Sequence, residues 1–406
     1  MSDLIRPKDE SELAAVVAEA NAAKTPLEVC GAGSKRNVGR PLQIASSVTT
    51  ERLRGVTLYE PNELVLSARA GTPLKDIEAA LAKNNQQLAF EPVDLGPMLG
   101  EEENQATIGA VFAANLSGAR RIQVGSARDH LLGIRAVTGR GEIIKSGGRV
   151  MKNVTGYDLC RGIAGSWGTL SVMSEVTMKV LPKPEAERTL LFIGLTDEVA
   201  IDALCRALGT PFEVSGTAHL HAEYARRLLD TEILRRPAAV TALRLENFEE
   251  SLNYRADRLA ESLTAFGKVV ELDDQQSGDF WNGMRTLSFL TDSDDPVWRI
   301  STAPTDGSKV VSALSKRLDC RAAYDWSGGL IWLQTGPTAD AGATEVRRVL
   351  SETGGHATLI RADASLRSSL DVFHPMSSGV AALTRKLKQS FDPAGVLNPG
   401  RMYAGI

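Results

Sequence analysis

Apolar positions near the start of the chain follow two different periods. In residues 11–24 they recur every three to four positions, which predicts an amphipathic helix that Pro26 ends. Residues 27–30 and 63–70 are short runs rich in apolar residues, which are typical of strands. After Gly71, Thr72 and Pro73 are the residue types of a helix N-cap and of a first helical position. This part of the chain is therefore predicted to alternate helices and strands.

Glycine is concentrated between residues 107 and 182, where strands are predicted at 133–138, 142–145 and 170–181. Because glycine has no Cβ, repeated glycines between strands allow the backbone to approach a ligand closely. A turn-rich sheet without a ligand explains the same composition. The segment predicts strands and leaves the ligand open.

The second half of the chain has a different pattern. Residues 183–188 are polar, follow Pro182 and contain Pro184, so we expect them to link two lobes. Beyond them, predicted strands at 189–195 and 240–245 alternate with helices at 198–208 and 254–266, and residues 381–390 form a basic amphipathic helix. The predicted fold class is α+β, with two distinct lobes.

The composition excludes several classes of protein. The 406 residues are 43% hydrophobic and 24% charged, and 46 basic against 50 acidic side chains leave a net charge of -4. This balance, with an aromatic content of 5%, argues against nucleic-acid binding. The apolar runs are far shorter than the ~20 residues that cross a bilayer, and the N-terminus lacks the apolar segment of a signal peptide. We expect a cytoplasmic protein that reaches the inner membrane only through partners.

Metal binding is not expected from the cysteine and histidine spacing. The four cysteines form no C-x-x-C pair, and the five histidines show no H-E-x-x-H spacing. One arrangement stays open, because His219 and His221 on a strand would share a face and could offer three ligands together with Glu223. A polar strand face is the alternative.

Residues 31–35, Gly-Ala-Gly-Ser-Lys, follow a predicted strand. Backbone N–H groups freed by Gly31 and Gly33 can form an anion-binding nest, with Lys35 as the counter-charge. The loop lacks the third glycine of a dinucleotide-binding fingerprint, where Arg36 stands, and it lacks the Gly-Lys-Ser/Thr of a Walker A loop. The interpretation left is a phosphate-binding loop of another kind.

Later motifs are more specific. They are residues 106–110 (Ala-Thr-Ile-Gly-Ala), 115–118 (Asn-Leu-Ser-Gly), 152–159 (Lys-Asn-Val-Thr-Gly-Tyr-Asp-Leu), 165–170 (Gly-Ser-Trp-Gly-Thr-Leu) and 391–401, which starts Phe-Asp-Pro and ends Leu-Asn-Pro-Gly-Arg. Their order and spacing resemble the FAD-binding fold of the vanillyl-alcohol oxidase and p-cresol methylhydroxylase superfamily, over essentially the whole chain. Within it the chain is most similar to the FAD-binding subunits of bacterial glycolate oxidases.

The resemblance implies an arrangement of domains. It implies a two-subdomain FAD-binding domain at residues 1–185, an α+β cap domain of the substrate-binding type at 186–390, and a C-terminal tail at 391–406 that returns to the FAD-binding domain. It also implies non-covalent FAD, because residues 31–40 contain no histidine for covalent attachment. His130 is interpreted as structural.

The resemblance further assigns cofactor contacts. Residues 31–35 would hold the pyrophosphate, and the glycine-rich segment would wrap the diphosphate and the isoalloxazine edge. Glu175 and Val176 would lie near the adenine, and the tail would approach the flavin. The set is Gly31, Ala32, Gly33, Ser34, Lys35, Thr107, Ile108, Gly109, Asn115, Ser117, Gly118, Glu175, Val176, Asn398 and Arg401.

Several positions depart from the family pattern. Ala110, Trp167 and Ser171 stand where Gly, Glu and Gly are usual. Close catalytic relatives take a base from a Gly-Glu-His-Gly motif, whereas residues 354–358 here read Gly-Gly-His-Ala-Thr. Oxidation of a 2-hydroxy acid also needs a cation for the carboxylate. The candidate catalytic residues are His356, Arg361 and His374, and each has packing or surface exposure as its alternative.

The function implied by the resemblance is that of an FAD-binding subunit in a complex that oxidises glycolate or another small 2-hydroxy acid. A second flavoprotein subunit and an iron-sulfur subunit are the expected partners, because this chain has no cysteine cluster to carry electrons. Two roles stay open: the chain is an FAD-dependent dehydrogenase in its own right, or it carries a flavin and its partner oxidises the substrate. The altered motif around His356 favours the second. A phosphate-binding protein unrelated to flavin would require the later motifs to be accidental.

Overall fold

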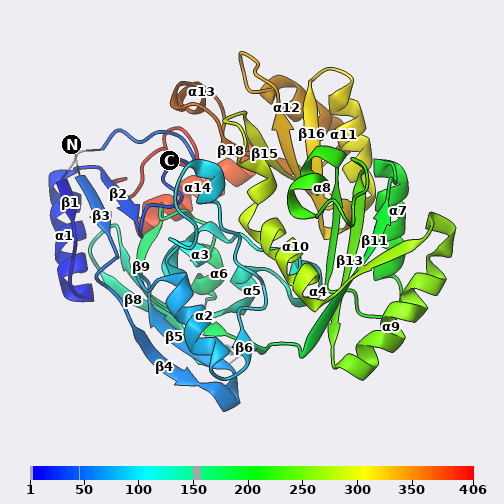
Figure 1. The fold of residues 1–406 in the computed structure, drawn as a ribbon. Helices are drawn as coiled ribbons and strands as arrows, with labels where there is room; N and C mark the ends of the chain where they lie inside the picture. Colours follow the sequence, from blue (N-terminus) through cyan, green and yellow to red (C-terminus); the bar gives the residue numbers. More distant parts are fainter. Residues whose placement is uncertain (1–2, 45, 150–156) are drawn as a thin grey trace.

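The computed structural model describes residues 3–44, 46–149 and 157–406. Two lobes lie side by side in Figure 1. The first lobe holds the strands up to residue 182 together with the C-terminal tail, and the second lobe holds the strands from residue 186 to 361. No helix in these described ranges combines the length and the apolar character needed to cross a membrane.

The first lobe contains two main sheets. Its strands are β1 (Asp3–Ile5), β2 (Leu27–Cys30), β3 (Ser46–Thr49), β4 (Val56–Glu60), β5 (Val65–Arg69), β6 (Gln86–Gln87), β7 (Leu131–Thr138), β8 (Ile143–Gly147), β9 (Ser171–Lys179) and β10 (Leu181–Pro182). A parallel sheet has the order β1-β3-β2, and an antiparallel sheet has the order β4-β5-β9-β7-β8. β6 and β10 pair separately. Its helices are α1 (Glu10–Ala23), α2 (Leu74–Ala82), α3 (Ile108–Ala114), α4 (Arg121–Val124), α5 (Ala127–His130) and α6 (Leu159–Ile163).

Helix α1 follows the predicted apolar pattern and begins one residue early. Asp9 is its N-cap, and its carboxylate accepts the backbone N–H of Glu12 at 2.9 Å. Leu13, Val17 and Ala20 are buried against the parallel sheet. The cap therefore decides where the helix starts, and the apolar stripe decides which face is buried.

The predicted cap of α2 is wrong. The helix begins at Leu74, and Pro73 occupies the N-cap position. The Thr72 hydroxyl instead donates to the Arg69 carbonyl at 2.6 Å and accepts the Gly55 N–H at 2.9 Å. Thr72 therefore closes the turn after β5, where its two hydrogen bonds compete with a capping role.

The second lobe is built on one large sheet. Its strands are β11 (Ala186–Ile193), β12 (Gly216–Leu220), β13 (Val240–Asn247), β14 (Val269–Leu272), β15 (Val297–Ser301), β16 (Cys320–Asp325), β17 (Leu330–Thr335) and β18 (His356–Arg361). All pairs are antiparallel, in the order β14-β11-β13-β12-β16-β17-β15-β18. Because β11 already begins at Ala186, the connection between the lobes is shorter than the predicted linker at 183–188.

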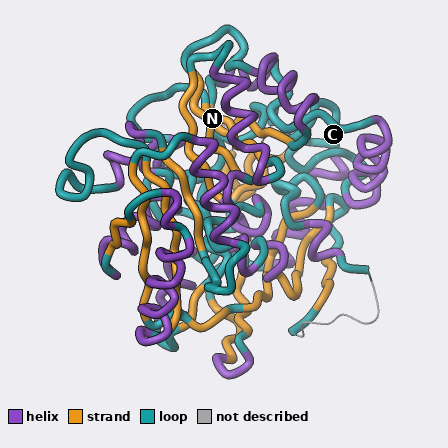
Figure 2. Tube along the Cα trace, turned by 90° about the vertical axis from the view of Figure 1, so that its right-hand side faces the viewer, coloured by secondary structure: helices purple, strands orange, loops and turns teal. Residues whose placement is uncertain are grey.

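Helices cover the second sheet. They are α7 (Asp197–Leu208), α8 (Ala222–Leu228), α9 (Glu249–Ser262), α10 (Asp274–Thr286), α11 (Gly307–Ser315), α12 (Ala343–Thr353) and α13 (Ala364–Ser369). Figure 1 shows α7 and α9 on the side away from the first lobe and α10 on the side towards it. Seen from the second lobe in Figure 2, helices lie in front of the strands. Helices α8 and α10 share the other face of the sheet with the first lobe.

The strand register shows which side chains occupy that face. Residues paired directly across an antiparallel ladder point to the same side. Arg299 lies opposite Thr358 and Trp332, and Ser301 lies opposite His356. By the same register Asp325 and Arg244 share this face, and Arg244 contacts Glu91 of the first lobe. Charged side chains of the second sheet therefore meet the first lobe.

The C-terminus returns to the first lobe through α14 (Ser378–Phe391) and the tail that follows it. The Leu27 N–H donates to the Val396 carbonyl at 2.8 Å, and the Asn398 N–H donates to the Leu27 carbonyl at 3.0 Å. Lys388 is buried, and its ammonium donates to the Thr169 carbonyl at 2.7 Å. The tail thus lies along β2, at the edge of the parallel sheet.

Candidate functional site

A pocket opens in the first lobe where β2 passes into the glycine-rich loop. It is lined by residues 29–36, by one side of α3, by residues 167–173 except 169 and 170, and by Arg401 of the tail. About 700 Å³ of space lies within it, part of it open to solvent. Both sheets of the first lobe and the returning tail thus contribute to one site.

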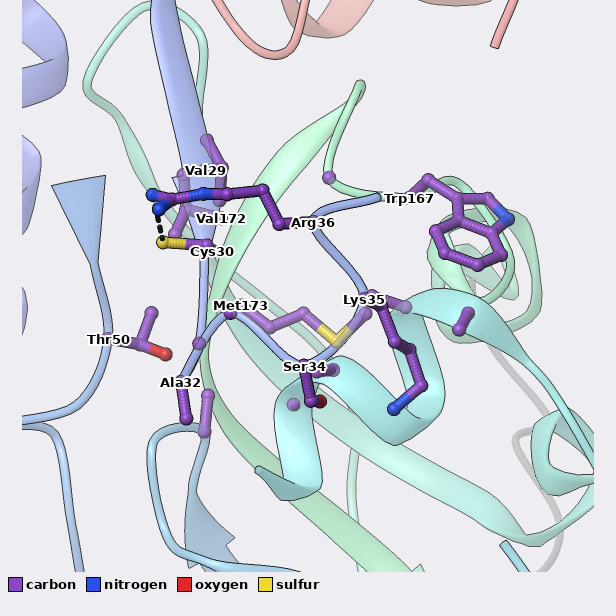
Figure 3. A pocket seen from close by; sticks show the side chains of 18 of the residues that line it. Val29, Cys30, Ala32, Ser34, Lys35, Arg36, Thr50, Trp167, Val172 and Met173 are labelled. Atoms are coloured by element: carbon purple, nitrogen blue, oxygen red, sulfur yellow. Dashed lines mark hydrogen bonds between the residues drawn. The ribbon is translucent and has the colours of Figure 1, made fainter. Parts of the chain in front are cut away.

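The glycine-rich loop places a buried cation in this pocket. Ser34 and Lys35 project from the loop on one side, whereas Arg36 turns back towards Cys30 (Figure 3). The Lys35 ammonium is buried and has no hydrogen-bond partner among the described residues. Burial lowers the pKa of Lys35, and the charge of Asp94 opposes this. An unpaired buried ammonium is costly, so the site is suited to an anionic ligand.

Other polar atoms around the pocket also lack partners among the described residues. They include the Ser171 hydroxyl, the Thr107 hydroxyl and the Nε of Arg401. Arg401 is fixed in place by a hydrogen bond from its Nη2 to the Lys35 carbonyl at 2.8 Å. These groups form a set of donors for a ligand rich in oxygen atoms.

The glycines of the site have different roles. Gly33 has a φ of 88°, and a Cβ built there meets no protein atom within 4 Å, so a side chain would project into free space beside the pocket lining. A Cβ on Gly31 would come within 2.2 Å of the Thr107 hydroxyl. A Cβ on Gly109 would come within 2.7 Å of the Ala70 side chain. Gly109 is therefore required for packing α3 against the end of β5.

Three predicted residues lie beyond the C-terminal end of α3 and outside the pocket lining. Asn115 ends the helix in the left-handed region, with a φ of 51°, and its side chain accepts the Arg128 N–H at 2.9 Å. The Ser117 hydroxyl accepts the Ala127 N–H at 2.9 Å. Gly118 donates its N–H to the Glu91 carbonyl at 2.8 Å. Ile108, at the start of α3, is fully buried in the core.

Glu175 and Val176 also lie outside this pocket. Val176 is fully buried in the core of the first lobe, and Glu175 lines a separate depression beside Arg135. Ser171, Val172 and Met173, at the start of the same strand, line the pocket instead. The pocket thus receives the N-terminal end of β9, and the adenine contact predicted for Glu175 and Val176 stays a prediction.

Asn398 lies behind the pocket wall and is not part of the pocket lining. Its amide oxygen accepts the Val29 N–H at 2.8 Å, and its amide nitrogen donates to the Trp167 carbonyl at 2.8 Å. Val29 and Trp167 both line the pocket, whereas the Asn398 side chain is fully buried. Asn398 thus holds two pocket walls together.

All three positions that depart from the family pattern, Ala110, Trp167 and Ser171, line the pocket. Trp167 has a φ of 54°, an uncommon conformation for a bulky residue. Its ring lies 5.9 Å from that of Phe373 and 5.7 Å from the Arg401 guanidinium. The departures therefore change the wall of the pocket and leave the fold unchanged.

Arg361, predicted as a candidate catalytic residue, donates hydrogen bonds to backbone carbonyl groups through its Nε and Nη1. Its Nε donates to the Asp295 carbonyl at 2.8 Å. Its Nη1 donates to the Leu290 carbonyl at 2.7 Å and to the Met98 carbonyl at 3.1 Å. Met98 belongs to the first lobe, so Arg361 joins the lobes, while its buried Nη2 has no partner among the described residues.

The two candidate histidines lie near one another. His356 is exposed at the start of β18, and its ring forms no hydrogen bond with a described residue. His374 is half-buried, with its Nδ1 3.0 Å from Nη1 of Arg347 and 3.4 Å from the Ala357 N–H. Partial burial and nearby arginine charges lower the pKa of both histidines. The lowered pKa favours the neutral form of both rings, and the Nδ1 contacts hold the His374 ring in place.

His219 and His221, which the sequence left as possible metal ligands, form a hydrogen-bonded cluster with Asp197 in the second lobe. His219 Nε2 lies 3.2 Å and His221 Nε2 lies 3.1 Å from Oδ1 of Asp197. Glu223 instead pairs with Arg321 at 2.9 Å. Across the described ranges, no group of three or more His, Cys, Asp or Glu side chains is arranged to hold a metal ion.

The remaining motif residues have structural positions where the structure describes them. His130 is buried, and its Nε2 lies 3.0 Å from the Val124 carbonyl. Asp158 caps α6 by accepting the Arg161 N–H at 3.2 Å, and Tyr157 is exposed. Of the motif at 152–159, residues 152–156 lie outside the described residues.

A cluster that the sequence did not reveal lies between the lobes. The guanidinium carbons of Arg121 and Arg299 lie 4.1 Å and 5.2 Å from the centre of the Trp326 ring. The Trp326 indole donates to the Gly118 carbonyl at 2.9 Å. The only sequence signals were an Arg-Arg pair after the 115–118 motif and a Trp before Gly328 and Gly329.

Comparisons with known proteins indicate an FAD-binding protein. A family model for an FAD binding domain matches residues 2–147. Glycolate oxidase subunit GlcE of Escherichia coli (strain K12) is 35% identical, over 99% of this chain and 100% of the relative. Glycolate oxidase subunit GlcD of Bacillus subtilis (strain 168) is 23% identical, over 99% of this chain and 88% of the relative. The structure of p-cresol methylhydroxylase with substrate bound matches with a TM-score of 0.73 at 13% identity, covering 99% of this chain and 88% of that one.

The fold is that of p-cresol methylhydroxylase, and the site and the relatives define an FAD-dependent oxidoreductase. The chain belongs to the family of glycolate oxidase subunit GlcE. The residues present fit FAD, because the buried Lys35 ammonium and the Ser171 hydroxyl lack partners within the described part of the chain and Gly33 leaves room beside them.

Proposed function

We propose that this chain is the FAD-binding subunit of a complex that oxidises a small 2-hydroxy acid, glycolate first among them, to the 2-oxo acid. The buried ammonium of Lys35 in the pocket carries the proposal, because no described residue pairs with it and an anionic cofactor would neutralise its charge. The similarity to GlcE along the whole chain supports the choice of reaction.

The residues of the pocket have defined tasks in this proposal. When bound, FAD supplies the two-electron acceptor that oxidation of a 2-hydroxy acid requires. The loop at 31–35 holds the pyrophosphate, with Lys35 neutralising its charge and the N–H groups around Gly33 completing the nest. Arg401 and Trp167 form the wall that the tail fixes. We propose that FAD is bound without a covalent link.

Electrons then leave this chain for a partner. No cluster of metal-ligating side chains exists in the described ranges that could pass them on within the chain. We propose a second flavoprotein subunit and an iron-sulfur subunit as partners, in the cytoplasm, with any membrane contact made by the partners. The surface of α14 supports an assembly, because Val380, Leu383 and Leu387 are 53%, 69% and 38% exposed on one stripe of the helix.

A second candidate is that this chain oxidises the acid itself, as a dehydrogenase that needs only an external acceptor. The observation that favours it is the pair of arginines at Trp326, Arg121 of the first lobe and Arg299 of the second, which form no ion pair with a described residue. The altered motif at His356 disfavours it.

An anaerobic titration with glycolate separates these functions. We expect the assembled complex to lose its visible flavin absorbance on addition of glycolate, and the isolated chain to keep it. Loss of absorbance by the isolated chain would establish the second candidate. A complex that keeps its absorbance with glycolate and with other small 2-hydroxy acids would contradict the proposed reaction.

The mode of FAD binding is tested separately. Acid precipitation of the purified chain should release the yellow chromophore into the supernatant. Colour that stays with the pelleted protein would show a covalent link.

A further inference from the structure

Helix α14 lies on the surface with its apolar side chains uncovered. Of its 14 residues, all of them described, only Lys388 is buried. Val380, Leu383 and Leu387 have the i, i+3, i+7 spacing of one helix face, and none of them belongs to a hydrophobic core among the described residues. Helices in proteins derive most of their stability from packing of such a face. The apolar stripe of α14 is therefore open to a partner.

The C-terminal end of α14 is fixed to the first lobe through Lys388. Its buried ammonium donates to the Thr169 carbonyl and to the Asp392 carboxylate, each at 2.7 Å, and to the Leu397 carbonyl at 2.9 Å. These three bonds use all the donors of an ammonium group. The helix is thus held to the chain by a polar anchor, and its apolar stripe takes no part in this contact.

This anchor also joins α14 to the wall of the pocket assigned to FAD. Thr169 lies between residues 167–168 and 171–173, which line the pocket. Leu397 precedes Asn398, whose amide nitrogen donates to the Trp167 carbonyl at 2.8 Å. Both connections are short. A protein that docks on α14 is therefore attached next to the pocket wall.

The charge of this segment narrows the kind of partner. The whole chain has a net charge of -4, yet residues 372–391 contain no Asp or Glu, whereas α14 carries three basic side chains. Lys386 follows Leu383 by three positions, so it borders the apolar stripe. Arg385 lies on the opposite side of the helix, at about 100° of rotation per residue, and lines a hollow beside the C-terminal tail. The stripe is thus an apolar surface with a basic edge.

Two other occupants fit these observations less well. A second copy of the chain would present the same basic side chains, and its α14 has no carboxylate to pair with Lys386. Helices that lie on a lipid surface usually combine an apolar face containing aromatic residues with many basic side chains. The stripe of α14 has no aromatic residue, and two of its basic side chains are exposed. The groove of another protein, with acidic side chains at its edge, matches the stripe better.

We propose that the apolar stripe of α14 docks into an apolar groove of a partner subunit, where a carboxylate at the edge of the groove pairs with Lys386. A helix that lays its i, i+3 and i+7 side chains into a groove is a recurring mode of protein recognition. Opposite charges at the edge fix the orientation of the docked helix and speed the encounter. That the docked subunit is also the acceptor of electrons from this chain rests on the proposed function.

Binding to the second flavoprotein subunit and the iron-sulfur subunit, purified together without this chain, tests the stripe and its basic edge separately. Dissociation constants are measured for the FAD-loaded chain as wild type, Leu383→Ala, Lys386→Glu and Arg385→Glu. We expect Leu383→Ala and Lys386→Glu each to weaken binding by about tenfold or more. Arg385→Glu makes the same charge reversal on the other side of the helix, so it should weaken binding by less than about threefold.

Several results would overturn the proposal. The docking site is wrong if wild-type chain does not bind the two subunits, or if Leu383→Ala and Lys386→Glu bind them as tightly as Arg385→Glu does. A dimer of the isolated chain that Leu383→Ala abolishes would make a second copy the occupant. Binding to vesicles of phosphatidylethanolamine and phosphatidylglycerol that Lys386→Glu abolishes would make a lipid surface the occupant.

The docking site and the proposed function can fail separately. If binding depends on Leu383 and Lys386 and the complex oxidises no 2-hydroxy acid, the proposed function fails and the docking site stands. All three substituted side chains are exposed, so we expect the variants to keep the FAD content and melting temperature of wild type. Leu383→Ala and Lys386→Glu test the same surface independently, so either decides the question if the other does not fold.

Discussion

Arg244 of the second lobe and Glu91 of the first form a bidentate ion pair, with Nη1 to Oε1 at 2.7 Å and Nη2 to Oε2 at 3.0 Å. The Arg244 side chain is 2% exposed. Glu246 lies 3.4 Å from the Arg244 Nε and 2.5 Å from Arg120 of the first lobe. The contact between the lobes is thus a buried network of alternating charges.

This network should dominate the stability of the lobe contact. Arg244→Leu leaves the Glu91 carboxylate partly buried without its main partner, so we expect a loss of about 3–5 kcal/mol in the free energy of unfolding, measured with urea. The control is Arg255→Gln, which breaks the more exposed pair between Arg255 and Glu213. It should cost less than about 1 kcal/mol. Equal losses in both variants would show that the lobe contact carries no special stability.

Gly33→Val should lower the FAD content of the purified chain. The new side chain would stand beside the pocket at a φ of 88°, which β-branched residues rarely adopt. The ratio of flavin to protein absorbance measures the effect, with the surface variant Lys83→Ala as the control. Gly109→Val should lower FAD content for another reason, namely its collision with Ala70, and should also lower the melting temperature. A Gly33→Val protein with the same FAD content as wild type would show that the loop at 31–35 does not contact the cofactor.

Asp325 should make stability depend on pH. Burial, aided by the charge of Glu91, raises its pKa in the folded protein from 3.8 to about 7, against the opposing effects of the Trp326 N–H, Arg244 and Arg299. Between these values the unfolded chain has released a proton that the folded chain keeps. The contribution of Asp325 to stability is therefore complete below pH 4 and is lost as the pH rises towards 7, at about 1.4 kcal/mol per pH unit.

Asp325→Asn should remove this dependence. Urea unfolding at pH 5 and pH 8 gives the difference in stability between wild type and variant, and we expect that difference to shift in favour of the variant at pH 8. A difference that is the same at both values would show that Asp325 is already ionised in the folded protein at pH 5.

His356→Ala should lower glycolate turnover in the assembled complex by less than about tenfold, short of the loss expected for a general base. Its ring has no hydrogen bond with a described carboxylate that would orient it, and the family's motif glutamate is missing here. Initial rates at saturating glycolate, with His374→Ala as a neighbouring comparison, provide the measurement. Loss of activity by about a hundredfold in His356→Ala with FAD retained would make this chain the dehydrogenase.

Leu383→Glu should weaken assembly and leave the cofactor in place. Leu383 is 69% exposed in the middle of the apolar stripe on α14, so a charge there costs the isolated chain little. Size-exclusion chromatography of the mixed subunits should show less complex, while FAD content matches wild type. Arg385→Gln, a change on the same helix that adds no charge, serves as the comparison. Unchanged recovery of the complex would place the interface elsewhere.

Local patterns allowed several elements to be predicted from the sequence. The apolar spacing of residues 11–24 and the run at 27–30 place α1 and β2 within one residue, because their buried faces are set by side chains close in sequence. The glycine-rich loop at 31–35 can be recognised from the sequence because glycine tolerates backbone conformations, including positive φ, that other residues rarely adopt. The resemblance of the later motifs supplied the cofactor and the family.

Only the tertiary structure decided which side chains form the sites. Ser171, Val172 and Met173 line the pocket because the N-terminal end of β9 lies beside the glycine-rich loop, a placement set by the pairing of β9 with β5 and β7. Arg361 joins the lobes, since carbonyl groups distant in sequence accept from its Nε and Nη1, whereas its Nη2 has no partner among the described residues. Arg121 and Arg299 are 178 positions apart by their numbering and meet at Trp326 only after both lobes have folded. Local sequence sets the elements, and the docking of distant strands sets the chemistry between them.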